Sequence, residues 1–501
     1  LQSVGLTSSR LIEGYMRAPY AMYFSRNSAE LIRNLNRSCN DVFGLLQASI
    51  NLAFEIVIAL FLTAGLIYIQ PLATVVVIGL LALVMGSVAL SVRRVLERLG
   101  AQTQNSQTAI LKTAQEAFAA AKEAKVLGKE DYFVKQYAEH RMEGMRIQLW
   151  GVTILDIPRL VGEVAMVGCV VVTIGVVFLF ARSDSVNMAQ LLGLFGYVGL
   201  RLLPASSRIV YNLGFIRHFR PAIDMVYPDF KRYCIEASAA QAVKARDLPF
   251  SRALEVREVS YTYPGTASPV LRNVNLTVPK GAAIGIIGST GAGKSTLIDL
   301  ILGLLPVDSG RILLDGVDIT EDPRPLQRKI GYVPQSICLL DGTLRRNIAF
   351  GVPDDEIDEE RVDQALRMAS LHGFVAELPD GLDTVIGERG VRLSGGQRQR
   401  VGIARALYPQ PELVVFDEAT SALDSETEKE VTAAIDQLIG QRTLIVIAHR
   451  LSTLRNCTDL IVIKDGVTMD AGNYATMMAN HPDYLQLAEI RESALFVPAG
   501  A

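Results

Sequence analysis

A glycine-rich segment at 288–296 has the residue types of a phosphate-binding loop. It fits G-x-x-x-x-G-K-[ST], with Gly288, Gly293, Lys294 and Ser295 at the fixed positions. Glycines let backbone N–H groups turn inward around phosphate oxygens, while Lys294 would reach the β- and γ-phosphates and Ser295 would ligate Mg²⁺. A chance glycine-rich turn is the alternative, which the preceding apolar strand and the following helix disfavour. The segment is Gly288, Ser289, Thr290, Gly291, Ala292, Gly293, Lys294, Ser295 and Thr296.

Two carboxylates, Asp417 and Glu418, follow an apolar run at 413–416. Because carboxyl ends of parallel strands meet at one edge of a sheet, we expect both near the phosphate loop. Asp417 would hold Mg²⁺ through water, and Glu418 would orient or deprotonate the attacking water. Gln335 offers a neutral oxygen to the metal and the water, and His449 could donate to the γ-phosphate. In isolation Gln335 and His449 would be surface or capping residues; their positions after strands favour the catalytic interpretation.

The elements that must position these residues begin near residue 253. Alternating apolar and polar residues predict antiparallel strands at 254–263, 270–278 and 310–319. Continuous apolar runs predict buried parallel strands at 283–287, 413–416, 443–447 and 460–463. A helix is expected at 295–304. The mixed polar stretch 228–250 predicts a linker, so this domain would span 251–487, with a tail at 488–501.

The overall composition indicates a membrane protein. Of 501 residues, 50% are hydrophobic, and the mean hydropathy is positive, which is too apolar for a purely soluble enzyme of two or three domains. The net charge of −3 provides no basic surface for nucleic acid. The five cysteines form no C-x-x-C pair and are expected to be reduced thiols.

Four apolar segments are each near the length of a membrane-spanning helix. They lie at about 42–69, 71–92, 160–181 and 186–213. A long polar connection at 93–159 is rich in lysine and arginine, whereas the connections at 70–71 and 183–185 are minimal turns. Since positive charge marks the cytosolic side, the long connection, residues 1–40 and everything after the fourth span are expected in the cytosol.

Together, residues 253–485 resemble the nucleotide-binding domain of an ATP-binding cassette (ABC) transporter. The resemblance rests on the phosphate loop, Gln335, the signature at 393–397, the strand ending in Asp417-Glu418, a D-loop at 421–424 and His449 as switch histidine. It implies ATP and Mg²⁺ as cofactors and an adenine-stacking role for Tyr263. The segment 387–390 resembles one characteristic of exporters.

In this family the signature contacts ATP that is held by the phosphate loop of a second domain. The resemblance therefore implies a dimer, with a second copy of the chain or with a paralogous half-transporter. It assigns this contact to Ser394, Gly395, Gly396, Gln397 and Asp424.

The N-terminal half resembles an exporter membrane domain. The segments 17–30 and 124–133 are similar to the first and second intracellular coupling helices. Such exporters have six spans per half and four are visible here, so residues 1–15 are interpreted as the cytosolic end of the second span and the sequence as a fragment; a natural four-span half is the alternative. The expected architecture is multidomain: an all-α transmembrane domain (1–227) followed by an α/β P-loop NTPase domain.

Ionisable residues within the spans are candidates for substrate contact. Arg201 and Arg208, seven residues apart, share a helix face, and with Arg159 they would suit a phosphate-bearing headgroup. The alternatives are that Arg159 pairs with Glu163 and that Arg208 lies at the cytosolic interface. The segments around Arg159 and at 200–209 resemble the bacterial lipid-linked oligosaccharide flippases.

Three functions compete at this stage. The favoured one is an ATP-driven half-exporter in the cytoplasmic membrane, dimeric, that flips an amphipathic, lipid-linked substrate across the bilayer. The second is a drug, lipid or peptide exporter subunit of a heterodimer. The third is a soluble cassette ATPase of translation or DNA repair, which the four spans and the lack of a basic surface argue against.

Overall fold

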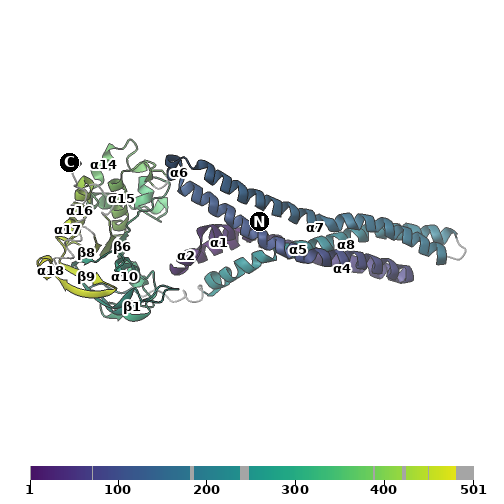
Figure 1. Cartoon of the computed structure of the whole chain (residues 1–501), viewed down its shortest axis with the longest axis horizontal. Helices are drawn as coiled ribbons and strands as arrows, with labels where there is room; N and C mark the ends of the chain where they lie inside the picture. The colour runs from purple at the N-terminus through teal and green to yellow at the C-terminus, as the bar shows by residue number, and fades with distance from the viewer. Residues whose placement is uncertain are drawn as a thin grey trace. The chain divides into compact units, whose positions relative to one another are not determined.

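The chain divides into two compact units, Leu1–Val243 and Lys244–Ala501. The computed structural model describes residues 2–69, 71–180, 185–236, 247–387, 390–419, 425–448 and 451–480. Figure 1 labels the elements of both units. The predicted tail at 488–501 lies outside the described residues.

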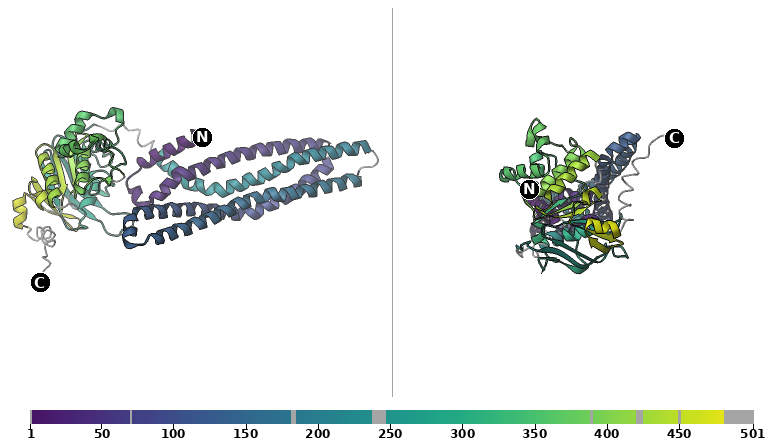
Figure 2. Two further views of the ribbon diagram at one scale, coloured as in Figure 1. Left: turned by 90° about the horizontal axis from the view of Figure 1, so that it is seen from above. Right: turned by 90° about the vertical axis from the view of Figure 1, so that its left-hand side faces the viewer.

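All the regular secondary structure described in the first unit is helical. Its long helices are α4 (Cys39–Ile69), α5 (Pro71–Ala119), α7 (Glu130–Phe180) and α8 (Ser185–Asp229). Helix α4 packs against α8, and α5 packs against α7 and α8, so the long helices run alongside one another (Figure 2). The short elements are α1 (Gln2–Met16), α2 (Ala21–Ser25), α3 (Ser28–Arg33), η1 (Asn34–Ser38), α6 (Ala121–Leu127) and η2 (Phe230–Glu236).

Large apolar side chains cover the outside of α4. Phe61 is 81% exposed and Tyr68 is 92% exposed within the unit, an arrangement suited to lipid contact. Among the described residues, the segments Ser28–Ile69 and Thr74–Ala119 are long and apolar enough to cross a membrane. The third and fourth predicted spans lie on the backbones of α7 and α8, where most side chains fall outside those described. Short helix α2 lies within the first segment that resembles a coupling helix, and α6 overlaps the start of the second.

The second unit is built on two sheets. The four-stranded sheet has the order β2-β1-β4-β5 and is antiparallel. The six-stranded sheet has the order β10-β9-β3-β8-β7-β6, parallel except for β10. The strands are β1 (Ala253–Tyr261), β2 (Leu271–Pro279), β3 (Ala283–Ile287), β4 (Ser309–Leu314), β5 (Val317–Asp318), β6 (Ile330–Val333), β7 (Leu413–Asp417), β8 (Thr443–Ile447), β9 (Asp459–Lys464) and β10 (Val467–Gly472).

The helices of this unit cover the sheets. They are α10 (Lys294–Ile301), α11 (Arg324–Gln327), α12 (Leu344–Ile348), α13 (Glu359–Met368), α14 (His372–Glu377), α15 (Gly395–Leu407), α16 (Ser425–Leu438), α17 (Leu451–Leu454) and α18 (Tyr474–Asn480), with single turns η3 (Asp354–Glu356) and η4 (Gly381–Asp383).

The six-stranded sheet separates two hydrophobic cores. Because successive side chains of a strand point to opposite faces, β7 contributes Val414 and Phe416 to one core and Val415 to the other. Helix α15 packs into the first core and α10 into the second. Strands β3, β7, β8 and β9 are buried on both faces, which explains their continuous apolar runs.

The structure corrects three sequence expectations. The segment 310–319 is not one strand: it turns at Asp315 and Gly316, both with positive φ (52° and 85°), between β4 and β5. Helix α10 begins at Lys294 and ends at Ile301, earlier than the expected 304. Residues 228–236, where a linker was expected to begin, form the end of α8 and the π-helical turn η2.

Candidate nucleotide site

The candidate residues gather because of the strand order in the parallel sheet. Strands β3, β8, β7 and β6 are consecutive neighbours, so their carboxyl ends lie along one edge. The loop at 288–293 follows β3, Asp417 ends β7, and Gln335 follows β6. Strand β8 ends at Ile447 at the same edge; His449 and Asp424 lie outside the described residues.

The phosphate loop requires its glycines. Gly293 has φ +99°, and a Cβ there would lie 2.6 Å from Leu271 Cδ2. A Cβ on Gly288 would lie 2.3 Å from the Ile463 carbonyl oxygen. Gly291 also has positive φ, at +84°, so the chain turns sharply here, a conformation that directs backbone N–H groups toward an anion. Ser289, Thr290 and Ser295 are exposed, whereas Ala292 and Thr296 are buried.

Lys294 lies against this loop and is 5% exposed. Its ammonium donates to the carbonyl oxygens of Gly288, at 2.8 Å, and Ser289, at 3.1 Å. Burial lowers the pKa of Lys294, and the nearby carboxylates of Glu418 and Asp417 oppose that shift. A partly desolvated cation in this position is suited to pairing with phosphate oxygens.

Tyr263 is connected to the same loop. Its hydroxyl lies 3.1 Å from Thr296 Oγ1, and its ring meets Tyr261 edge to face at 5.1 Å. The aromatic ring to which the family resemblance gives the adenine-stacking role is therefore held beside the first turn of α10.

Glu418 and Gln335 are in direct contact. The Gln335 side-chain amide donates to Glu418 Oε2 at 2.7 Å, and the Glu418 N–H donates to the Ile447 carbonyl at 3.0 Å. Glu418 has φ +50°, an uncommon conformation for a residue with a side chain. The backbone thereby turns directly after Asp417.

Two further residues near Asp417 were missed from sequence. The Tyr332 hydroxyl, on β6, donates to Asp417 Oδ2 at 3.4 Å. Burial, and then the charge of Asp417, raise the pKa of Asp299 on α10 to about 6. Tyr332 lies three residues before Gln335, but nothing in the surrounding sequence predicted a polar contact for its hydroxyl.

The signature residues form the start of α15. Ser394 Oγ accepts from the Gln397 N–H at 3.2 Å, and Gln397 Oε1 accepts from the Ser394 N–H at 2.8 Å, so the two form a capping box. A Cβ on Gly396 would lie 1.6 Å from Thr427 Cγ2 of α16. The signature begins a helix that packs on one face of the sheet, and the phosphate loop leads into α10 on the other face.

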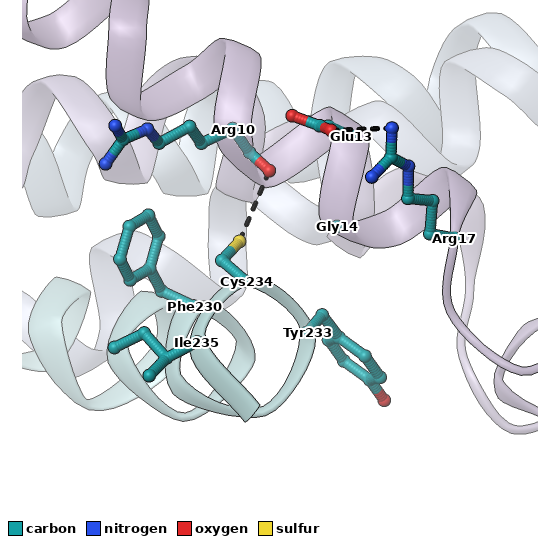
Figure 3. Close-up of a pocket in the computed structure, with 8 residues that line it drawn as sticks. All are labelled: Arg10, Glu13, Gly14, Arg17, Phe230, Tyr233, Cys234 and Ile235. Atoms are coloured by element: carbon teal, nitrogen blue, oxygen red, sulfur yellow. Dashed lines mark hydrogen bonds and ion pairs between the residues drawn. The ribbon is translucent and has the colours of Figure 1, made fainter. Parts of the chain in front are cut away.

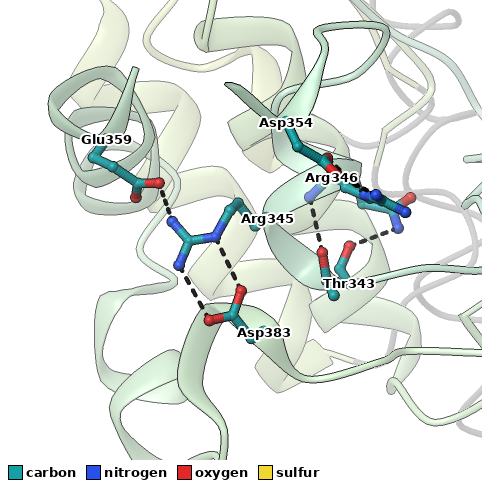
Figure 4. Close-up of polar contacts among 7 residues, drawn as sticks. Thr343, Arg345, Arg346, Asp354, Glu359 and Asp383 are labelled. Carbon is teal, nitrogen blue, oxygen red and sulfur yellow. Dashed lines mark hydrogen bonds and ion pairs between the residues drawn. The ribbon is translucent and has the colours of Figure 1, made fainter. Parts of the chain in front are cut away.

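Arginines connect the region between Gln335 and the signature. Arg405 of α15 donates to the carbonyl oxygens of Asn347, at 2.8 Å, and Cys338, at 2.7 Å. Arg345 on α12 pairs with Asp383 at 3.0 Å and with Glu359, and Arg346 pairs with Asp354 (Figure 4). These contacts bind α12, α13, η4 and α15 into one packed body that also carries the loop following Gln335.

The candidate substrate arginines have acidic partners. Arg208 Nε lies 2.7 Å from Glu55 Oε1, which joins α8 to α4. Arg159 Nε lies 3.7 Å from Glu163 Oε1, one turn along α7. The Arg201 side chain lies outside those that the structure describes. The pairing of Arg159 with Glu163 matches the alternative considered from sequence.

Family models match both units. The model described as ABC transporter matches residues 271–421, and the model described as ABC transporter transmembrane region matches residues 7–200. The chain belongs to the ABC transporters and fuses a transmembrane exporter domain to an ABC ATPase domain, which confirms the predicted fold class.

The chain is also similar to individual proteins. It is 43% identical over 239 residues to the ATP-dependent lipid A-core flippase of Salmonella typhimurium, and 42% identical over 239 residues to that of Escherichia coli. Each match covers 48% of this chain and 41% of the relative. The matched part of the chain therefore corresponds to less than half the length of each relative. A solved structure of a bacterial Atm1-family ABC exporter with ATP bound has a TM-score of 0.82 at 24% identity, covering 98% of this chain and 86% of that one, and it has the same fold.

Proposed function

We propose that this chain is one half of an ATP-hydrolysing exporter that, as a dimer in the cytoplasmic membrane, flips an amphipathic lipid-linked substrate between leaflets. The observation that carries the ATPase part is the contact of Gln335 with Glu418 at the sheet edge that holds the phosphate loop. The name of the flippase relatives supports the substrate class.

Nucleotide binding uses residues from three elements. The Tyr263 ring stacks on adenine, the N–H groups of 288–296 surround the phosphates, and Lys294 neutralises their charge. Ser295, Gln335 and, through water, Asp417 offer the hard oxygen ligands that Mg²⁺ prefers. The ion would neutralise charge on the β- and γ-phosphate oxygens.

Hydrolysis requires a positioned water. Glu418 orients it or accepts its proton, and the Gln335 amide fixes the carboxylate that does so. His449 donates to the γ-phosphate. Each of these roles is a proposal that rests on the placement of Gln335 and Glu418 and, for His449, on the sequence motif.

A second copy completes the site. Ser394, Gly395, Gly396, Gln397 and Asp424 of one chain contact the ATP that the other chain's phosphate loop holds. The packing of α15 and α10 on opposite faces of the sheet supports this arrangement, because the start of a helix offers its N–H groups to an anion and the two helix starts then belong to different faces of one chain.

A drug, lipid or peptide exporter is the second candidate. It is favoured by the ion pairs of Arg208 with Glu55 and of Arg159 with Glu163. A guanidinium already paired with a carboxylate attracts a phosphate headgroup less than an unpaired one.

The test is ATP-dependent flipping in liposomes that contain the purified protein and a fluorescent polyprenyl-pyrophosphate sugar. The wild-type protein is expected to flip this lipid. Glu418→Gln is expected to bind ATP unchanged and to hydrolyse it about 100- to 10,000-fold more slowly, the usual contribution of a general base. Wild-type hydrolysis by this variant would contradict the role of Glu418. Stimulation of ATPase by uncharged drugs or peptides but not by the pyrophosphate lipid would favour the second candidate.

A further inference from the structure

A buried carboxylate lies at the end of α8. Asp229 is 1% exposed, and its Oδ2 accepts hydrogen bonds from Tyr15 Oη at 2.7 Å, from Arg26 at 2.6 Å and from Asn34 Nδ2 at 3.2 Å. A buried carboxylate is costly unless it is paired and hydrogen-bonded. These three donors, all far from Asp229 in sequence, satisfy it.

The donors come from three successive segments. Tyr15 is on α1, Arg26 directly follows α2, and Asn34 begins η1. Burial, and then the hydrogen bond to Asp229, raise the pKa of Tyr15 well above its usual range, so its hydroxyl remains a donor at physiological pH. One carboxylate therefore holds the segments before and after α2 against the end of α8.

The buried polar contacts continue from η1 into the long helices. Ser38 Oγ donates to Gln104 Oε1 of α5 at 3.3 Å, and Gln104 Nε2 donates to Asp41 Oδ2 of α4 at 2.9 Å. Arg33 donates to Thr108 Oγ1 of α5. The segment that carries α2 is thus fixed to α4 and α5 as well as to α8.

Two π-helical turns flank this carboxylate. η1 (Asn34–Ser38) begins at one of the donors, and η2 (Phe230–Glu236) begins directly after Asp229. Such turns are rare and often lie at functional sites. They mark positions where a helix can change its hydrogen-bonding register.

Helix α1 and η2 are in close contact beside the carboxylate. A Cβ on Gly14 would lie 2.8 Å from Cys234 Sγ, and Cys234 Sγ donates to the Arg10 carbonyl at 3.2 Å. Arg10, Tyr233 and Cys234 line a cavity of about 340 Å³, and Figure 3 shows Cys234 facing the Arg10 carbonyl. The Cys234 thiol is half-buried and therefore reports whether α1 and η2 stay together.

We propose that Asp229 with Tyr15, Arg26 and Asn34 forms a latch that keeps α2 and the end of α8 moving as one body, and that transport driven by ATP requires this latch. The proposal rests on the proposed function. The chain continues from η2 into the ATPase unit, and α2 lies in the segment that resembles a coupling helix. Nucleotide-driven movement would reach the spans through these two segments. The latch connects one segment to the other. Asp229 is a positioning residue; it belongs to no nucleotide contact.

The central test compares Asp229→Asn with Glu13→Gln. Glu13, on the same helix as Tyr15, pairs at 2.9 Å with Arg17 directly after that helix. Both side chains are more than half exposed, so loss of this pair is expected to change little. Asp229→Asn leaves Arg26 without its buried counter-charge. We expect lipid flipping per ATP hydrolysed to fall about tenfold in Asp229→Asn, with basal ATPase within about twofold of wild type. Glu13→Gln is expected to match wild type in both assays.

Two milder variants separate the latch from a folding defect. Tyr15→Phe removes one hydrogen bond and leaves the ion pair of Arg26 with Asp229, so a smaller loss of flipping per ATP is expected. The double variant Arg26→Gln/Asp229→Asn removes both charges. It is expected to recover part of the lipid flipping per ATP hydrolysed that Asp229→Asn loses. If Asp229→Asn does not fold, the lipid flipping per ATP hydrolysed by Tyr15→Phe shows whether transport requires the latch.

A structural readout makes the latch testable apart from transport. The rate of Cys234 alkylation, measured by peptide mass spectrometry with exposed Cys338 as internal reference, is expected to rise about tenfold in Asp229→Asn. An unchanged rate in folded Asp229→Asn, or an ATPase loss equal to the transport loss, would overturn the latch. If the wild-type protein flips no pyrophosphate lipid, the proposed substrate fails, and the Cys234 measurement still decides the latch.

Discussion

Asp299 illustrates how one side chain can oppose folding where it lies close to a functional group. It is on α10, and burial followed by the charge of Asp417 raises its pKa to about 6. The folded state therefore binds this proton more tightly than the unfolded state. The stability it contributes is fully present below the unfolded pKa of about 4 and is lost as the pH rises through about 6.

Asp299→Asn is expected to stabilise the protein at pH 7.5 by about 1 kcal/mol, after allowance for the partial exposure of the group, with little gain at pH 4. Apparent melting temperatures of the whole chain at the two pH values measure this difference.

Asp315→Asn is the opposite control. Burial alone would raise the pKa of Asp315, but the N–H groups of Arg252, Ser251 and Ala253 lower it overall, so that variant should lose stability at pH 7.5. A lower melting temperature for Asp299→Asn at pH 7.5 would contradict the sign.

At the scale of elements, the sequence predicted the parallel strands well because both faces of each are buried. β3, β7, β8 and β9 lie where continuous apolar runs occur, and Asp417 ends β7 with Glu418 directly after it. The split of 310–319 was missed although Asp315-Gly316 is a strong hairpin signal. A strand before Gln335 was expected without bounds, and β6 occupies that place; its four residues, with a glycine among them, form too short a pattern to define its ends.

The contact between α15 and α16 shows why a signature glycine is structurally required. A Cβ on Gly396 would overlap Thr427 Cγ2. Nothing in the sequence of α15 or α16 predicted this close contact. Gly396→Ala is expected to destabilise the protein by about 1–3 kcal/mol through overpacking. The double variant Gly396→Ala/Thr427→Ala removes the clashing methyl group and should recover most of the loss in melting temperature. An equal loss in both variants would show that the glycine is required for another reason.

The contacts that lie farthest apart in sequence were beyond prediction. Tyr15, Arg26 and Asn34 are each about 200 residues from Asp229, and nothing in the spacing of these residues points to their meeting. The ion pair of Glu55 with Arg208 likewise joins two helices whose packing had to be known first. Motif residues were predictable because their spacing is local; the latch depends on tertiary packing.

At the scale of the whole molecule, two inactive variants should restore each other. Lys294→Ala disables the phosphate loop, and Ser394→Asp keeps a helix cap but places a negative charge at the signature. If each site combines a loop from one chain with a signature from the other, a mixed dimer keeps one intact site. Random mixing is expected to recover about a quarter of wild-type ATPase, because half of the dimers are mixed and each has one of two sites.

The matched control mixes Lys294→Ala with Glu418→Gln. Both residues belong to the same chain's part of a site, so the mixed dimer has no intact site and no recovery is expected. ATPase measured after dissociation and reassembly of purified variants compares the two mixtures. Recovery in neither mixture would contradict a homodimer with shared sites, and equal recovery in both would contradict the assignment of loop and signature to opposite chains.

The sheet that holds α10 and α15 on opposite faces also has a genetic consequence. A copy defective in both Lys294 and Ser394 would spoil one component of each site in any dimer it joins, including a dimer with an intact copy. With the two forms made in equal amounts, about a quarter of the dimers would be wholly intact. If the chain forms homodimers, an allele that carries both defects should therefore act dominantly over a functional one.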